Sequence, residues 1–118
     1  MKRRELAEWG EKTAADYLAA RNINIVEKNF RTRTGEIDLI GYDNKDLVFF
    51  EIKTRSSKKF GYPEEAIDKK KLEKIEAVAG EYIDLRNIDN INWRIDAVAI
   101  IRNPLYERHQ IKWFKDVR

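Results

Sequence analysis

The segment LVFFEIKTR, residues 47–55, constrains the fold of this chain more than any other feature of its sequence. Its valine, phenylalanine and isoleucine residues are typical of a strand inside a sheet. Glu51 and Lys53 interrupt this apolar run, although charged side chains are rarely buried unless a partner or a ligand compensates them. Because side chains alternate along a strand, both residues share a face with Leu47 and Phe49. The segment therefore predicts a buried strand that presents two functional charges.

Hydrophobic periodicity predicts the other elements of the chain. Apolar residues at helical spacing indicate a helix over residues 3–20 and a long or broken helix over 63–85, whose main part has Asp68 as its N-cap. Strands are expected over residues 23–30, 36–42, 47–55, 93–101 and, as a short final strand, within 109–117. Strict alternation places Ile37 and Leu39 on one face of their strand. This order predicts one α/β domain of 118 residues, in which helices flank a mixed sheet.

Composition excludes several classes of site and location. The chain has no cysteine, so it has neither a disulfide framework nor a thiolate metal site. The basic residues near the N-terminus are not followed by an apolar run, so we expect no signal peptide. No stretch approaches the roughly 18 apolar residues of a membrane span. We therefore expect a cytoplasmic protein that does not enter the membrane.

Positive charge gathers in three clusters around the 47–55 strand. The net charge is +3 and the isoelectric point is near 9.1. The clusters are RTR at residues 31–33, KTRSSKK at 53–59 and KKK at 69–71. Such clusters can simply be solvated surface, but their convergence on one strand favours a polyanionic partner. The residues that we predict to contact nucleic acid are Arg31, Arg33, Arg55, Lys58, Lys59 and Lys71.

The hairpin that precedes residue 51 is expected to bring acidic side chains together. A turn centred on residues 44–45 pairs positions whose numbers sum to 89. Asp38 then lies opposite Glu51, and Glu36 lies opposite Lys53 as its partner. Directly opposed side chains have Cβ atoms roughly 5 Å apart. The alternative to a site is an ordinary cross-strand salt bridge between Glu36 and Lys53.

Two carboxylates at this separation repel each other. At an effective dielectric constant of about 20 the cost is roughly 3 kcal/mol. Lys53 offsets part of this repulsion, and a divalent cation would offset more of it. Carboxylate oxygens suit Mg²⁺ or Mn²⁺. The pair Asp38 and Glu51 is therefore a candidate metal site.

The same residues carry a resemblance to a known superfamily. Asp38 followed by Glu51 and Lys53 on the next strand resembles the PD-(D/E)xK nucleases, although Ile37 stands where the name-giving proline would be. The blocks GEIDLI, VFFEIKTR, GYPEEAIDKKK and WRIDAVAI look like the YraN-like family of uncharacterised predicted endonucleases over nearly the whole chain. The layout is also similar to archaeal Holliday junction resolvases. The resemblance implies a restriction-endonuclease-like core.

The resemblance also implies roles for individual residues. Asp38 and Glu51 would be ligands of Mg²⁺ or Mn²⁺, and Lys53 would be the catalytic lysine. Glu11 would be the glutamate of the first helix and a further catalytic residue. Lys71 would be the additional basic residue that follows the motif in many members.

These residues predict a metal-dependent endonuclease that hydrolyses phosphodiester bonds in DNA, which could be branched or structured. A metal on Asp38 and Glu51 would activate the attacking water, while Lys53 would orient that water and offset phosphate charge. Cutting both strands of a junction would favour a homodimer. Two alternatives stay open: a non-catalytic nucleic-acid-binding module of the same fold, and a scaffold that binds a partner protein.

Several other polar and aromatic residues are interpreted as structural. Asp96 is expected to pair with Arg94 or with a loop amide, the alternative being a role in the site. Trp93 and Trp113 are expected in the core or at a sheet edge rather than as platforms for bases. His109, the single histidine, is expected to be exposed near a strand end.

Overall fold

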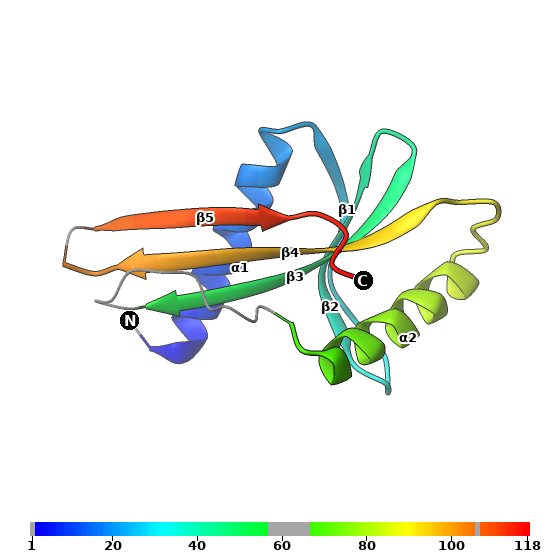
Figure 1. Ribbon diagram of the computed structural model, residues 1–118, viewed down its shortest axis with the longest axis horizontal. Helices are drawn as coiled ribbons and strands as arrows, with labels where there is room; N and C mark the ends of the chain where they lie inside the picture. The colour runs from blue at the N-terminus through cyan, green and yellow to red at the C-terminus, as the bar shows by residue number, and fades with distance from the viewer. Residues whose placement is uncertain (1, 57–66, 106) are drawn as a thin grey trace.

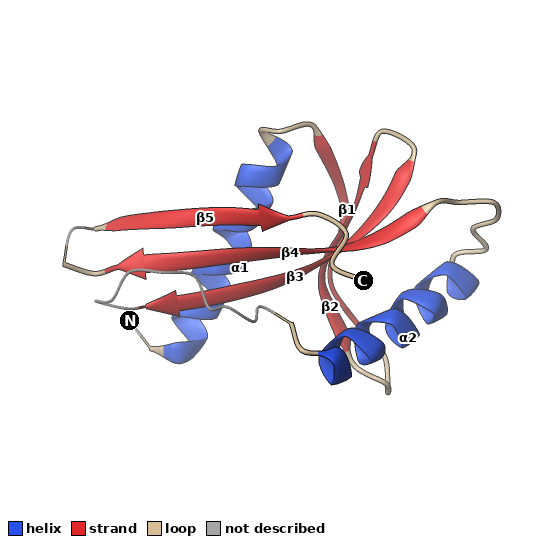
Figure 2. Ribbon diagram, in the orientation of Figure 1, coloured by secondary structure: helices blue, strands red, loops and turns tan. Residues whose placement is uncertain are grey.

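The computed structural model describes residues 2–56, 67–105 and 107–118, and it has the predicted α/β architecture (Figure 1). In these residues two helices and five strands follow one another in the expected order (Figure 2). The elements are α1 (Arg3–Ala19), β1 (Ile23–Arg31), β2 (Glu36–Asp43), β3 (Asp46–Ser56), α2 (Lys69–Leu85), β4 (Trp93–Asn103) and β5 (Arg108–Phe114). The expected short final strand is therefore seven residues long, and β4 ends directly before Pro104.

The five strands form one mixed sheet in the order β1-β2-β3-β4-β5. Neighbouring strands are antiparallel except for β3 and β4, which are parallel. A parallel pair needs a crossover connection, and α2 lies within that connection. The two helices lie on opposite faces of the sheet (Figure 1).

Alternation along β3 divides the core into two layers, as the sequence predicted. Val48, Phe50 and Ile52 pack beneath α1, whereas Leu47 and Phe49 pack beneath α2. All five are buried. Because β3 is the middle strand and is covered on both faces, its apolar run is nearly continuous. Glu51, which stands among these residues in the strand, therefore lies in a poorly hydrated environment.

The start of α2 carries the predicted cap. The Asp68 side chain accepts a hydrogen bond from the backbone N–H of Lys71 at 2.8 Å. This bond satisfies one of the donors that a helix start leaves unpaired. Pro63, where the sequence suggested an earlier beginning of the helix, lies outside the described residues.

Strand β2 departs from the alternation that was predicted for it. Leu39 packs beneath α1, but Ile37 packs beneath α2, so the two residues do not share a face. The break in alternation lies at Asp38. Its counterpart on β1, Asn29, has a left-handed backbone with φ of 52°. Irregularities of this kind re-aim side chains, and here the re-aimed side chain is a predicted site residue.

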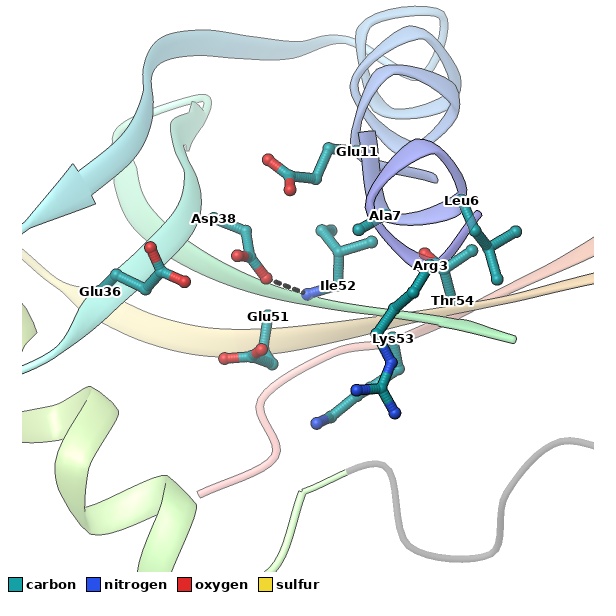
Figure 3. A pocket seen from close by; sticks show the side chains of 10 residues that line it. All are labelled: Arg3, Leu6, Ala7, Glu11, Glu36, Asp38, Glu51, Ile52, Lys53 and Thr54. Carbon is teal, nitrogen blue, oxygen red and sulfur yellow. Dashed lines mark hydrogen bonds between the residues drawn. The ribbon is translucent and has the colours of Figure 1, made fainter. Parts of the chain in front are cut away.

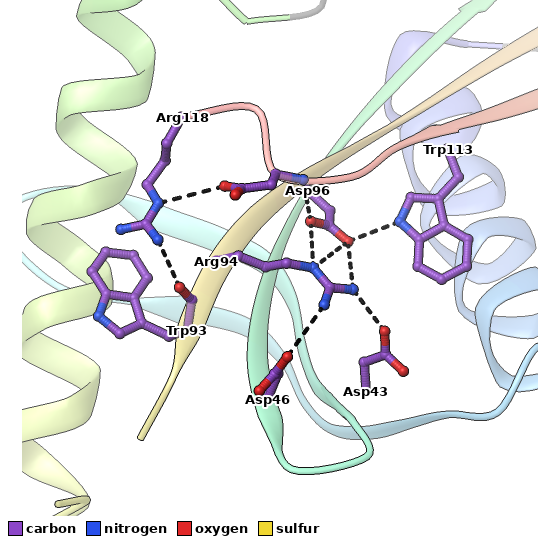
Figure 4. A network of polar contacts seen from close by, with 8 residues as sticks. Asp43, Asp46, Trp93, Arg94, Asp96, Trp113 and Arg118 are labelled. Atoms are coloured by element: carbon purple, nitrogen blue, oxygen red, sulfur yellow. Dashed lines mark hydrogen bonds and ion pairs between the residues drawn. The ribbon is translucent and has the colours of Figure 1, made fainter. Parts of the chain in front are cut away.

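A buried polar network holds the end of the chain against β4 (Figure 4). Asp96, which has no exposed surface, accepts hydrogen bonds from Arg94 Nε at 3.0 Å and Trp113 Nε1 at 2.9 Å. It also accepts the backbone N–H of Asp116 at 2.8 Å. Arg94 Nη2 donates in addition to Asp43 at 2.9 Å. The predicted partners of Asp96, an arginine and a loop amide, are both confirmed.

Candidate active site

A pocket of about 370 Å³ opens between the first half of α1 and the adjoining parts of β2 and β3 (Figure 3). It gathers side chains that are far apart in the sequence. The charged residues that line it are Arg3, Glu11, Glu36, Asp38, Glu51 and Lys53. Four of the residues with predicted catalytic roles are therefore brought together: Glu11, Asp38, Glu51 and Lys53.

The carboxyl groups of Asp38 and Glu51 meet, but not through the predicted direct pairing. The register that sums to 89 holds from the turn to the pair Leu39 and Phe50, where the paired ladder ends. Asp38 instead turns its carboxylate across to β3 and accepts the backbone N–H of Ile52 at 2.8 Å. A hydrogen bond between the carboxyl groups of Asp38 and Glu51 completes the contact. The break in β2 thus leaves Asp38 anchored to the backbone of β3, beside Glu51.

Burial, together with the negative charge of Asp38, raises the pKa of Glu51 to about 8, although Lys71 and Lys53 act in the opposite direction. The pKa of Asp38 is also raised by burial, although the hydrogen bond from Ile52 lowers it. Two interacting acids of this kind titrate as a pair. Near neutral pH the pair therefore retains a proton that a bound cation would displace.

Glu11 reaches the same pocket because α1 approaches β3 very closely at the preceding residue. A Cβ atom on Gly10 would lie only 1.9 Å from Thr54 Oγ1, so no side chain fits there. This close approach carries Glu11 over the sheet, and burial and the charge of Asp38 both raise its pKa. A hydrogen bond from Asn29, the left-handed residue of β1, lowers it. The placement of Glu11 in the pocket follows the prediction.

The lysines approach the acidic pair from two elements. Lys53 lines the pocket from β3, and Lys71 Nζ of α2 lies 3.9 Å from Glu51 Oε2. The predicted partnership between Glu36 and Lys53 is wrong. Glu36 pairs with Arg31 at 2.7 Å instead, because the register of β1 and β2 places these two residues opposite each other. Lys53 is thereby left available to a ligand of the pocket.

The remaining basic residues of the prediction divide into three groups. Arg33 and Arg55 are exposed, and Arg55 follows Lys53 by two residues on β3. Arg31 is exposed but paired with an acid, as described above. Lys58 and Lys59 lie outside the described residues.

Arg3 is a pocket residue that sequence reasoning missed. A signal for it was present. Arg3, Ala7 and Glu11 are spaced by four residues and so share one face of a helix. Once Glu11 is placed in the pocket, this spacing places Arg3 on the same side.

The donor set in the pocket fits a hard divalent cation. Within the residues that the structure describes, no three His, Cys, Asp or Glu side chains are grouped so that they could hold a metal. Mg²⁺ is nevertheless usually bound by one or two carboxylates together with waters and substrate phosphates. Asp38 and Glu51 supply two such carboxylates, so the site fits an ion that is completed by solvent and substrate.

Comparison with known proteins identifies the family of the chain. Residues 10–100 match the family described as Uncharacterised protein family UPF0102. The chain belongs to this family. The matched region contains Glu11, Asp38, Glu51 and Lys53, and the resemblance to the YraN-like family is thereby borne out.

Three relatives show how far the similarity extends. A UPF0102 protein of Clostridioides difficile is 41% identical over 100 residues, which cover 85% of this chain and 88% of that protein. A UPF0102 protein of Caldanaerobacter subterraneus is 44% identical over 95 residues, covering 80% and 78%. One from Caldicellulosiruptor saccharolyticus is 36% identical over 116 residues, covering 98% of both. No helix in the described part of the chain is long and apolar enough to cross a membrane.

Proposed function

We propose that the chain is a metal-dependent endonuclease that hydrolyses phosphodiester bonds in DNA. One observation carries the proposal: two hydrogen-bonded carboxyl groups, the half-buried Asp38 of β2 and the buried Glu51 of β3, line a pocket that Lys53 of β3 also lines. Acidic pairs of this kind favour the binding of a divalent metal ion, and the adjacent ammonium group of Lys53 can bind a phosphate. The likeness to PD-(D/E)xK nucleases agrees with this assignment.

Asp38 and Glu51 would hold Mg²⁺ or Mn²⁺. Such an ion, when bound, makes a coordinated water more acidic and offsets phosphate charge. The N–H of Ile52 orients Asp38, and Lys71 supports the ionised form of Glu51. Both contacts hold the two carboxyl groups in position for the ion, whose binding would displace the proton that they share.

Two further residues would act on the water and the phosphate. The ammonium of Lys53 can orient the water and offset the charge that develops on the phosphate. The pKa of Glu11 is raised in the direction of neutral pH, and an acid or base catalyst works best when its pKa lies near the working pH. Arg55, on the same strand as Lys53, would contact the phosphate backbone beyond the pocket. A junction cut on both strands would require two copies of the chain.

Substitution of Lys53 tests the proposal. Lys53→Ala should lower the rate of Mn²⁺-dependent cleavage by about 10²- to 10⁴-fold, because it removes one positioned catalytic group. Lys53→Arg should keep partial activity, since the charge remains but its compact shape does not. The measurement is a time course on labelled duplex, flap and junction DNA. Lys45→Ala is the matched control, because Lys45 is exposed in the turn at the other end of the same hairpin.

Two results would count against the proposal. Equal cleavage by wild type and Lys53→Ala would exclude a catalytic role for this lysine. Binding of DNA by wild type without cleavage of any substrate would instead favour the non-catalytic nucleic-acid-binding module.

A further inference from the structure

The charges of the pocket are segregated. Its acidic side is formed by Glu11, Glu36, Asp38 and Glu51. Figure 3 shows the Arg3 and Lys53 side chains, which both line the pocket, directed away from Glu11 toward the other side. An anionic ligand can bind the acidic side only through a bound metal ion. On the other side, the same ligand would meet the positive charges of Arg3 and Lys53 themselves.

Arg3 differs from its neighbour on the same helix in having no counter-charge. Arg4 Nε lies 3.3 Å from Glu8 Oε1, one turn along α1. Arg3 has no ion pair or hydrogen bond with any residue that the structure describes. Two cations at one side of a pocket repel each other unless an anion lies between them. The planar guanidinium group is well suited to phosphate, which it can bind through two parallel hydrogen bonds.

We propose that Arg3, together with Lys53, forms a second phosphate position, which holds the phosphate next to the scissile one on the cleaved strand. The inference rests on the proposed function, because that function places the scissile phosphate beside Asp38, Glu51 and Lys53. The bound strand then runs from the acidic pair past Lys53 toward the beginning of α1. The start of α1 thus contributes to substrate binding as well as to the fold.

The test compares two adjacent arginines in a binding measurement that requires no chemistry. Fluorescence anisotropy of labelled DNA, with a chelator present to prevent cleavage, gives the dissociation constant over a series of salt concentrations. Arg3→Gln should reduce the salt slope by about 0.9 on duplex or about 0.7 on single-stranded DNA, the value for one lost phosphate contact. Arg4→Gln, which removes the same charge one residue away, should change the slope much less. Arg3→Lys, which keeps the positive charge, should keep most of the wild-type salt slope.

The outcomes separate this inference from the nuclease proposal. Equal slopes for Arg3→Gln and Arg4→Gln, together with cleavage by wild type, would overturn the second phosphate position and leave the nuclease standing. A lower slope for Arg3→Gln alone, without cleavage by wild type, would show that Arg3 contacts a phosphate of bound DNA but would overturn the nuclease, and with it the place of that phosphate next to a scissile one. Salt-independent binding by wild type would overturn both.

Discussion

Two neighbouring regions of the sheet bury carboxyl groups in opposite ways. Asp96 on β4 is surrounded by donors: a guanidinium group, an indole N–H and a backbone amide all bind it. Glu51 on β3 is nearly as deeply buried, but its nearest cation, Lys71, is 3.9 Å away and an acid, Asp38, lies beside it. A satisfied buried charge holds structure together, whereas a poorly compensated one is poised for a ligand.

The partners explain why the first region is structural. The donors to Asp96 come from β4, from β5 and from the segment that follows β5, so the carboxylate joins parts of the chain that are distant in sequence. The Arg94 side chain is only 16% exposed, so its buried charge is compensated by Asp96 just as the charge of Asp96 is compensated by Arg94. By contrast, the acids of the pocket face open space into which a cation and a phosphate can enter.

Asp96→Ala should give the largest effect. Breaking a buried ion pair from one side typically lowers stability by about 3–5 kcal/mol, because the remaining charge stays buried without its partner. Chemical denaturation followed by tryptophan fluorescence measures the free energy of unfolding. Asp46→Ala is the control, because Asp46 is half exposed and contacts Arg94 only at 3.8 Å. It should cost no more than about 1 kcal/mol.

Similar losses in Asp96→Ala and Asp46→Ala would contradict the structural role assigned to Asp96. They would mean that the network contributes no more than an exposed ion pair.

Glu51→Gln should give a smaller effect of the opposite sign. The folded state keeps the proton of Glu51 up to about pH 8, whereas the ordinary pKa is 4.5. The folded state therefore binds more protons between these values, so the free energy of unfolding of the metal-free protein falls as the pH rises toward 8. The glutamine of Glu51→Gln is neutral at every pH, so this decrease in the free energy of unfolding should be absent from the variant. Glu51→Gln should therefore be more stable than wild type near pH 8, by less than the loss expected for Asp96→Ala, because Lys71 and Lys53 partly compensate the ionised Glu51 of the wild type.

The stabilisation should disappear near pH 5, where wild-type Glu51 is itself protonated. Denaturation curves at both pH values, recorded with a chelator, measure the difference. A Glu51→Gln variant that was less stable than wild type at both pH values would make Glu51 a structural residue like Asp96.

The order of elements could be predicted because it depends on local patterns. Apolar periodicity located the helices and strands, the turn at residues 44–45 fixed the hairpin register, and Asp68 was recognisable as a cap. The pairing of Asp96 with Arg94 was also predictable, since residues two apart on a strand share a face.

The shape of the pocket could not be predicted, because it depends on departures from regular geometry. A prediction from alternation assumes a regular strand, so it does not include the break at Asp38. The left-handed backbone of Asn29, opposite Asp38, was not predicted from the neighbouring sequence either. The prediction that Glu36 pairs with Lys53 was wrong for a related reason. The hairpin turn constrains only the pairing of β2 with β3, whereas Arg31 reaches Glu36 from β1, the other neighbour of β2.

The most direct test of the proposed metal site is a calorimetric titration with Mn²⁺ at about pH 6 and about pH 9. Ligands must be deprotonated before a metal binds them, so the raised pKa of Glu51 predicts tighter binding at the higher pH, by up to about tenfold per pH unit below 8, with release of a proton. Asp38→Asn should weaken binding sharply, because it removes one of two carboxylate ligands. Affinity that did not change with pH and was fully retained in Asp38→Asn would contradict a metal site at Asp38 and Glu51.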